Sequence, residues 1–305
     1  MKFGKFSLLV TVIVLAEAAC SQSTDQRLFS QYAMNVFAAQ SAACHGDYLV
    51  LVRKQVSKMA LYNLKSKKML CKRELVPWQE MRGKTDVYHA NNSSFGIQRF
   101  KDSDPFPLLY VSHRENNDKR GVLQVYRVIP LKSQNDKTDF DSLSVSLIQT
   151  IYYPKMTDKN ALGSPWTVID QENNWMYTYS RNNRRKASNM GVCRISKFRI
   201  PLIGESDEVY LNDEDVLDSY EVGFMAPQSQ GAFICKGKMY IAQGTSPEKF
   251  IWLRIIDLEK KKLVNSIDLK EAGFPKEPEG CFVYDGNLMI STLGKKIFKI
   301  NIPIE

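Results

Sequence analysis

Residues 230–242 read QGAFICKGKMYIA, and residues 279–291 read EGCFVYDGNLMIS. The two stretches align without a gap. Each has a polar residue, a glycine, a short apolar run, a turn that contains Gly237 or Gly286, and a second apolar run. Glycine in a short turn between two apolar runs is typical of a β-hairpin. Because the whole unit recurs, the sequence predicts a fold made of repeated hairpins.

Three further copies of this unit can be found along the chain. Residues 40–52 read QSAACHGDYLVLV, with a first strand one residue shorter. Another copy keeps both strands, at 166–170 and 173–179, but lengthens the turn. The least regular copy begins at His89 and has its second strand at 107–112. The five copies begin at residues 40, 89, 165, 230 and 279.

Each of the first four copies is followed by two further strands. Examples are residues 59–64 with 69–75, and residues 251–258 with 263–269. These outer strands alternate apolar and polar residues, as half-exposed strands do. Four short strands per repeat predict an all-β, five-bladed β-propeller. A pair of β-sandwiches is the alternative, but it does not explain why the copies start with the same polar and small residues.

The last copy ends early at the C-terminus, so its blade lacks an outermost strand. We expect the N-terminal stretch Arg27–Val36 to supply this strand. The ring would then close and leave only short, protected edges.

The N-terminus reads as a secretory signal. Lys2 and Lys5 precede an apolar run at residues 8–16, which is too short for a membrane span. Cys20 resembles a bacterial lipoprotein site, which predicts a lipid anchor there; plain cleavage after Ala18 is the alternative. We therefore expect a signal peptide at 1–19, a short linker at 20–26 and a single propeller domain at 27–305. The protein would be exported to the cell envelope and anchored in a membrane, in the periplasm or at the outer membrane.

The formal net charge is +9, which permits anionic partners such as acidic surface polymers. The lysine runs fall where hairpin turns are expected, and such runs are usually solvated. Export from the cell further disfavours nucleic acid as a partner, and we expect none. We expect a monomer.

Six cysteines are present, and their spacing matches no compact disulfide framework. Cys44, Cys235 and Cys281 lie within apolar strand patterns, where a free cysteine behaves as a small hydrophobic residue. We therefore expect mostly unpaired, buried thiols.

The first residues of the innermost strands should converge at one end of the propeller axis. Polar groups that converge in an apolar scaffold are the usual sign of a binding site. The alternative is that they only satisfy one another and the strand ends. His113 follows a strand and is expected at the surface. The predicted ligand-binding residues are Gln40, His89, Asn91, Trp166, Gln230 and Glu279.

The chemistry of this set favours binding over catalysis. Glutamine side chains are good partners for sugar hydroxyls, and Trp166 could be either a stacking platform for a sugar ring or a plug of the core. Glu279 with His89 could act as base and acid, or hold a divalent cation. No GxSxG, HExxH, P-loop or dinucleotide motif is present. We assign no catalytic residue, metal ligand or cofactor.

The leader, the blade copies and the segment EPEGCFVYDG at residues 277–286 resemble β-propeller lipoproteins of Bacteroides and its relatives. The Gln-Gly and Glu-Gly segments are distantly similar to propeller domains of helveticin-type bacteriocins and teichoic-acid-biosynthesis-like proteins. These resemblances imply an exported propeller that meets carbohydrate or another cell-surface polymer, and they supply no catalytic residues.

The leading hypothesis is therefore a recognition propeller with a polar axial pocket. A metal-assisted hydrolase or lyase on the same axis is the second hypothesis, and a protein-interaction scaffold is the third. The fold alone cannot choose among them, because propellers host all three.

Overall fold

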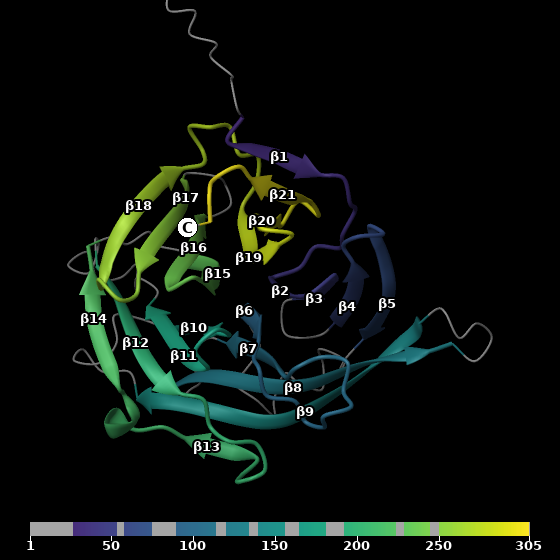
Figure 1. Ribbon diagram of the computed structural model, residues 1–305, viewed down its shortest axis with the longest axis vertical. Helices are drawn as coiled ribbons and strands as arrows, with labels where there is room; N and C mark the ends of the chain where they lie inside the picture. Colours follow the sequence, from purple (N-terminus) through teal and green to yellow (C-terminus); the bar gives the residue numbers. More distant parts are fainter. Residues whose placement is uncertain are drawn as a thin grey trace, which may run out of the picture.

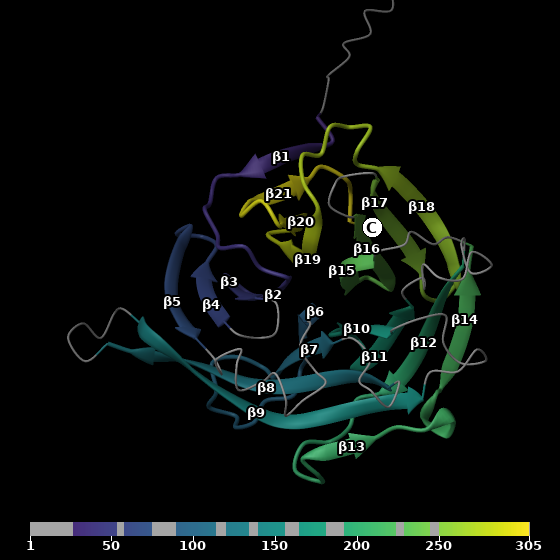
Figure 2. The same ribbon diagram turned by 180° about the vertical axis from the view of Figure 1, so that it is seen from behind.

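A computed structural model describes residues 27–53, 58–74, 90–113, 120–133, 140–155, 165–180, 192–223, 229–244 and 250–304. Within these residues, five separate antiparallel sheets are arranged around a common axis (Figures 1 and 2). This arrangement confirms the predicted five-bladed β-propeller. The predicted signal peptide, linker and lipid-anchor residue Cys20 lie outside the described residues.

Each of the first two blades follows the expected order, with the innermost strand first in sequence. The strands of blade 1 are β2 (Ser41–His45), β3 (Tyr48–Val52), β4 (Lys58–Asn63) and β5 (Lys68–Glu74). Those of blade 2 are β6 (Ala90–Phe95), β7 (Leu109–His113), β8 (Arg120–Lys132) and β9 (Phe140–Lys155), with β13 (Glu208–Tyr210) added outside β9.

The remaining blades have four strands each. Blade 3 contains β10 (Pro165–Asp170), β11 (Trp175–Ser180), β12 (Cys193–Arg199) and β14 (Asp218–Val222). Blade 4 contains β15 (Ser229–Cys235), β16 (Lys238–Gly244), β17 (Ile251–Asp257) and β18 (Lys262–Asp268). Blade 5 contains β19 (Pro278–Tyr284), β20 (Asn287–Thr292), β21 (Ile297–Ile300) and β1 (Phe29–Tyr32).

The ring is closed by the two ends of the chain. Strand β1 pairs with β21 in antiparallel register, with Phe29 opposite Ile300 and Tyr32 opposite Ile297. In Figure 1 the purple β1 lies on the outer side of the yellow β21. This confirms the prediction that the N-terminal stretch completes the last blade.

The turns of the two regular copies show why the sequence forms tight hairpins there. Lys236 and Gly237 have φ angles of 49° and 70°, and Asp285 and Gly286 have φ angles of 48° and 68°. Two consecutive positive φ angles define a type I′ turn, which matches the twist of the flanking strands. Glycine takes the second position because it adopts positive φ without steric cost.

Blade 2 departs from the pattern in two ways that the sequence did not predict. Its outer strands β8 and β9 contain 13 and 16 residues and extend as a hairpin beyond the ring (Figure 1). In addition, the connection between β12 and β14 of blade 3 carries β13, which pairs in parallel with β9. A 3-10 helix, η3 (Asp213–Asp215), follows β13 on this connection. Blades 2 and 3 are therefore joined at the rim as well as near the axis.

Among the described residues, the hydrophobic core forms five clusters, one at each seam between neighbouring blades. At the seam of blades 1 and 2, for example, Val50 and Leu61 lie in one cluster with Leu109 and Val111, and all four side chains are fully buried. Burial of the alternating apolar side chains between blades is the main source of stability in such a fold.

All five cysteines of the described residues are free, as expected from the sequence. Cys71, Cys193 and Cys281 are buried, whereas Cys44 and Cys235 are partly exposed. Burial raises the pKa of the Cys281 thiol to about 12, so it stays protonated at neutral pH. In the described part of the chain, no helix is both long and apolar enough to cross a bilayer.

Candidate functional site

The candidate site lies where the innermost strands begin. We use the term axial belt for the five predicted residues that the structure describes at this level: Gln40, Asn91, Trp166, Gln230 and Glu279. The sixth, His89, lies outside the described residues. The repeat placed His89 at the start of an innermost strand. In the structure β6 starts at Ala90, so Asn91 is the polar residue at this position.

Three members of the belt occupy the same irregular position of their strands. The pairing register shifts by one residue at Asn91 in β6, at Gln230 and Gly231 in β15, and at Glu279 in β19. An extra residue in one strand forms a β-bulge, which bends the strand and re-aims a side chain. The shared bulge therefore gives these three polar side chains an equivalent origin near the axis.

Hydrogen bonds of the belt connect neighbouring blades. The Gln40 amide donates to the carboxylate of Glu279, which joins blades 1 and 5. The Gln230 amide donates to Glu277 Oε1 at 2.8 Å, which joins blades 4 and 5. The Tyr179 hydroxyl donates to the carbonyl of Gln230 at 2.6 Å, which joins blades 3 and 4. Three seams are thus closed by polar contacts at one end of the axis.

Asn92, the neighbour of Asn91, joins three blades. Its fully buried side-chain amide donates to the carbonyls of Thr167 at 2.7 Å and Ala232 at 3.3 Å. Its amide oxygen accepts from the backbone N–H of Ala232 at 3.1 Å. The structure thus gives Asn92 a bracing position between β6, β10 and β15.

The innermost strands approach closely beside the belt. A Cβ atom on Gly231 would lie 2.6 Å from the Cα of Gly280 and 2.6 Å from the backbone N of Cys281. A Cβ atom on Gly280 would lie 2.5 Å from the Cβ of Ala42. Glycine is required at both positions because the next strand occupies the space of a side chain. The backbones of blades 4, 5 and 1 are therefore in direct contact at this level.

The belt is enclosed. The exposed fractions are 1% for Asn91, 2% for Trp166 and Glu279, and 6% for Gln230, while Gln40 is half-buried. Buried polar groups are nearly always hydrogen-bonded in proteins, and a charged group especially needs a partner. The belt therefore forms a polar layer inside an apolar molecule.

Trp166 carries a buried N–H donor without a hydrogen-bond partner among the described residues. Its ring packs edge-to-face against Tyr179, with 5.9 Å between ring centroids, and burial holds the pKa of Tyr179 well above its usual range. The Trp166 Nε1–H is buried and has no hydrogen-bond partner in the described part of the chain. The structure thus gives Trp166 a core position rather than an exposed platform, with one buried donor unsatisfied.

His113 was missed by sequence reasoning, which expected it at the surface. It is the last residue of β7, lies opposite Ala90 and is fully buried. The equivalent positions in the other second strands are also polar, with Ser180 in β11 and Thr292 in β20, both at most 3% exposed. Comparison of these strand ends would have placed His113 beside the belt.

The described residues contain no group of three or more His, Cys, Asp or Glu side chains that could hold a metal ion. The cation considered from the sequence would have used Glu279 with His89, and His89 lies outside these residues.

Comparisons with known proteins gave matches in structure only. No protein-family model matches the chain, and no curated protein matches it. A glutaminyl cyclase of Myxococcus xanthus has a TM-score of 0.46 at 12% identity, with 89% of this chain and 92% of that chain covered. A luciferin-regenerating enzyme has a TM-score of 0.40 at 10% identity, with 87% and 72% covered. Hydrazine synthase of Kuenenia stuttgartiensis has a TM-score of 0.39 at 9% identity, with 83% and 61% covered. At these values none of the three supports an inference about the ligand or activity of this chain.

Proposed function

We propose that this protein is a recognition propeller that binds a hydroxyl-rich ligand, a carbohydrate or another cell-surface polymer, at the axial belt. The propeller fold itself supports a ligand-binding or scaffold role in general. The observation that carries the finer proposal is the buried Trp166 Nε1–H without a partner. An unsatisfied buried donor costs about 1–3 kcal/mol, and a ligand oxygen at this position would recover that cost.

The composition of the belt supports a neutral, hydroxyl-bearing ligand. Amide side chains offer both donors and acceptors, and a hydroxyl group needs both. The Glu279 carboxylate accepts from Gln40, and a carboxylate is an acceptor for hydroxyl groups. An anionic ligand would meet two carboxylates, Glu277 and Glu279, without a lysine or arginine among the belt residues.

A glycan array with purified protein tests this proposal. The wild type should bind a defined subset of neutral glycans, and Trp166→Phe, which keeps an aromatic ring but removes the N–H, should weaken that binding about tenfold. Trp252→Phe, on β17 outside the belt, is the matched control and should bind as the wild type does.

Absence of binding to every glycan, or binding that Trp166→Phe leaves intact, would contradict the proposal. A stoichiometric divalent cation in the purified protein that is lost on Glu279→Ala would favour the metal-assisted hydrolase or lyase instead. Capture of a protein partner with neither glycan nor cation would favour the scaffold.

We also propose that the protein is exported and anchored through a lipid on Cys20. The supporting observation is the leader, with Lys2 and Lys5 before an apolar run and then Cys20. Metabolic labelling with a radioactive fatty acid should mark the wild type and not Cys20→Ala, and the variant should leave the membrane fraction. Equal partition of both proteins to the membrane would contradict the anchor.

A further inference from the structure

A cavity lies away from the axis, on the outer part of blade 3. It has a volume of about 440 Å³, within the range of small-molecule sites. Its walls are β12, β14 and the segment of η3, and its polar residues are Arg194, Ser196, Asp213, Ser219 and Glu221. We call this cavity the outer groove. None of its residues belongs to the axial belt.

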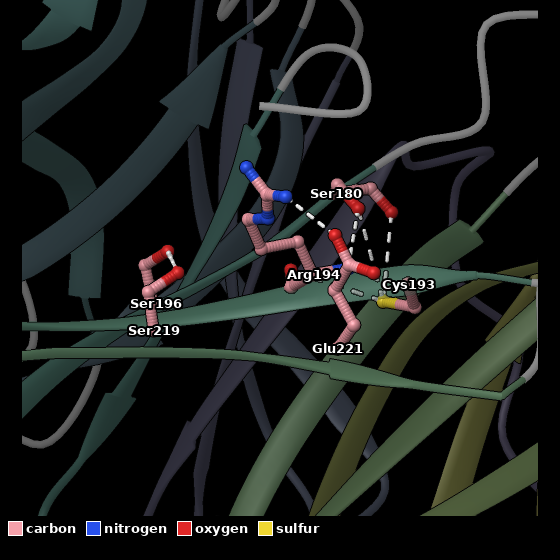
Figure 3. A network of polar contacts seen from close by, with 6 residues as sticks. All are labelled: Ser180, Cys193, Arg194, Ser196, Ser219 and Glu221. Carbon is pink, nitrogen blue, oxygen red and sulfur yellow. Dashed lines mark hydrogen bonds and ion pairs between the residues drawn. The ribbon is translucent and has the colours of Figure 1, made fainter. Parts of the chain in front are cut away.

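The pairing of β12 with β14 places the polar side chains of the groove in two cross-strand pairs. Arg194 lies opposite Glu221, and Ser196 lies opposite Ser219. The Arg194 guanidinium forms an ion pair with Glu221, and the two serine hydroxyls are 3.0 Å apart (Figure 3). Residues two apart on a strand share one face and lie about 7 Å from each other. The two cross-strand pairs therefore stand side by side on one surface.

The position of Arg194 is fixed by its own backbone. Its N–H donates to the Ser180 hydroxyl at 2.8 Å, and the Cys193 thiol beside it contacts the carbonyl of Ser180 at 3.8 Å (Figure 3). Ser180 and Cys193 are both almost fully buried. The backbone at this end of the groove is thus held in place, so less conformational entropy of the protein is lost when a ligand binds there.

The charges of the groove select against ionic ligands. The carboxylates of Glu221 and Asp213 disfavour an anion, and the Arg194 guanidinium, already paired with Glu221, opposes the approach of a second cation to that carboxylate. The groove offers hydrogen-bond donors and acceptors side by side. A hydroxyl group both donates and accepts, so it complements them. The spacing of about 7 Å between the two pairs is close to the width of a sugar ring with its hydroxyls.

We propose that the outer groove is a second binding site, for one or two neutral sugar units of a glycan. The ion pair would hold one hydroxyl pair of the ring and the Ser196–Ser219 pair another. This site does not depend on the axial belt, so either site can fail without the other.

An amide NMR titration of the full protein tests the outer groove. The probes are the methyl glycosides of glucose, galactose and N-acetylglucosamine, with lysine methyl ester and inorganic phosphate as a cation and an anion. At least one glycoside should shift the amide signals of residues 193–196 and 218–222, and neither ion should do so. Glu221→Gln and Ser219→Ala should each raise the Kd about tenfold. The Glu221 side chain is 46% exposed, so its variant should fold.

Two controls separate the groove from the axial belt and from general charge effects. Trp166→Phe should leave glycoside binding at the groove unchanged even if it abolishes binding at the belt. Glu74→Gln removes an exposed carboxylate that is also paired, with Lys58, and should have no effect. The proposal is overturned if no glycoside moves the groove signals, if either ion moves them equally, or if Glu221→Gln binds as tightly as the wild type. Shifts produced only by an extended peptide along β14 would assign the groove to a protein partner instead, and would also overturn it.

Discussion

At the axis, β15 and β19 approach so closely that Gly231 has no space for a side chain, whereas at the rim blade 2 gains β13 from its neighbour and exposes it to solvent. The axial contacts are buried backbone and amide groups, such as Asn92 between three blades. The rim contacts are exposed, as in the stacked pair of Tyr152 and the 53% exposed Tyr210. The axis is thus fixed by the close fit of its backbones, whereas the rim can carry an additional strand without disturbing that fit.

The largest effect should come from filling the close approach at the axis. Gly231→Ala places a Cβ atom 2.6–2.9 Å from three backbone atoms of β19, which cannot move aside as a side chain can. We expect a loss of about 3 kcal/mol or more in the free energy of unfolding, measured by urea denaturation. Gly223→Ala is the control, since its Cβ would have no atom within 4 Å. Equal stability of the two variants would refute the close approach.

The next effect should come from the bracing amide at the axis. Asn92→Ala leaves the carbonyl of Thr167 and both backbone groups of Ala232 without this buried partner. We expect a loss of about 2–3 kcal/mol in the free energy of unfolding. Asn265→Ala, an exposed asparagine on β18, should change it by less than about 0.5 kcal/mol. A loss below 1 kcal/mol for Asn92→Ala would show that the axis is not braced in this way.

A smaller, pH-dependent effect is expected between axis and rim, in the loop after β6. Asp104 is buried and accepts two hydrogen bonds from Arg127, at 2.6 and 2.8 Å, which lower its pKa below the ordinary 3.8. The folded state therefore gains stability from this pair above pH 3.8, and loses it as the pH falls through the lowered pKa. Asp104→Asn should cost about 1–2 kcal/mol near neutral pH and much less at pH 2. A deficit that stays constant with pH would exclude the ion pair as its cause.

The smallest effect should be seen at the rim. Glu74 forms an ion pair with Lys58 at 2.6 Å, and its side chain is 67% exposed. Exposed pairs contribute little because water and salt screen them. Glu74→Gln should therefore change the free energy of unfolding by no more than about 0.5 kcal/mol, and the change should vanish in 1 M salt. A loss as large as that of Asn92→Ala would remove the distinction between axis and rim.

The same distinction explains how much the sequence could predict. The blades could be predicted because Gly237, Gly286, Gly231 and Gly280 stand at positions where the backbone requires glycine, so they repeat with the fold. Their closure could be predicted because the last copy is one strand short. Strand β13 could not be predicted, because it has only three residues and pairs with the outer strand of the neighbouring blade, so it leaves no periodic signal in the sequence.

The sequence placed the residues of the axial belt at the starts of the innermost strands, as the structure does, but it did not predict their burial. Gln40, Gln230 and Glu279 were found from the repeat, and the structure brings Gln40 to Glu279 directly and Gln230 to Glu277. The sequence left open whether Trp166 was a platform or a core residue, since either role suits an aromatic side chain after a proline. Only the packing of Tyr179 against it decides for the core.

The indole N–H signals of the four tryptophans give the most direct test of the axial belt as a binding site. The Trp166 signal can be assigned by its loss in Trp166→Phe, and that of Trp252 likewise. Addition of a glycan that binds should shift the Trp166 indole signal and slow its exchange with water, because the ligand supplies the missing acceptor. The Trp252 signal should not move. A glycan that binds by calorimetry but leaves the Trp166 indole signal in place would contradict the account.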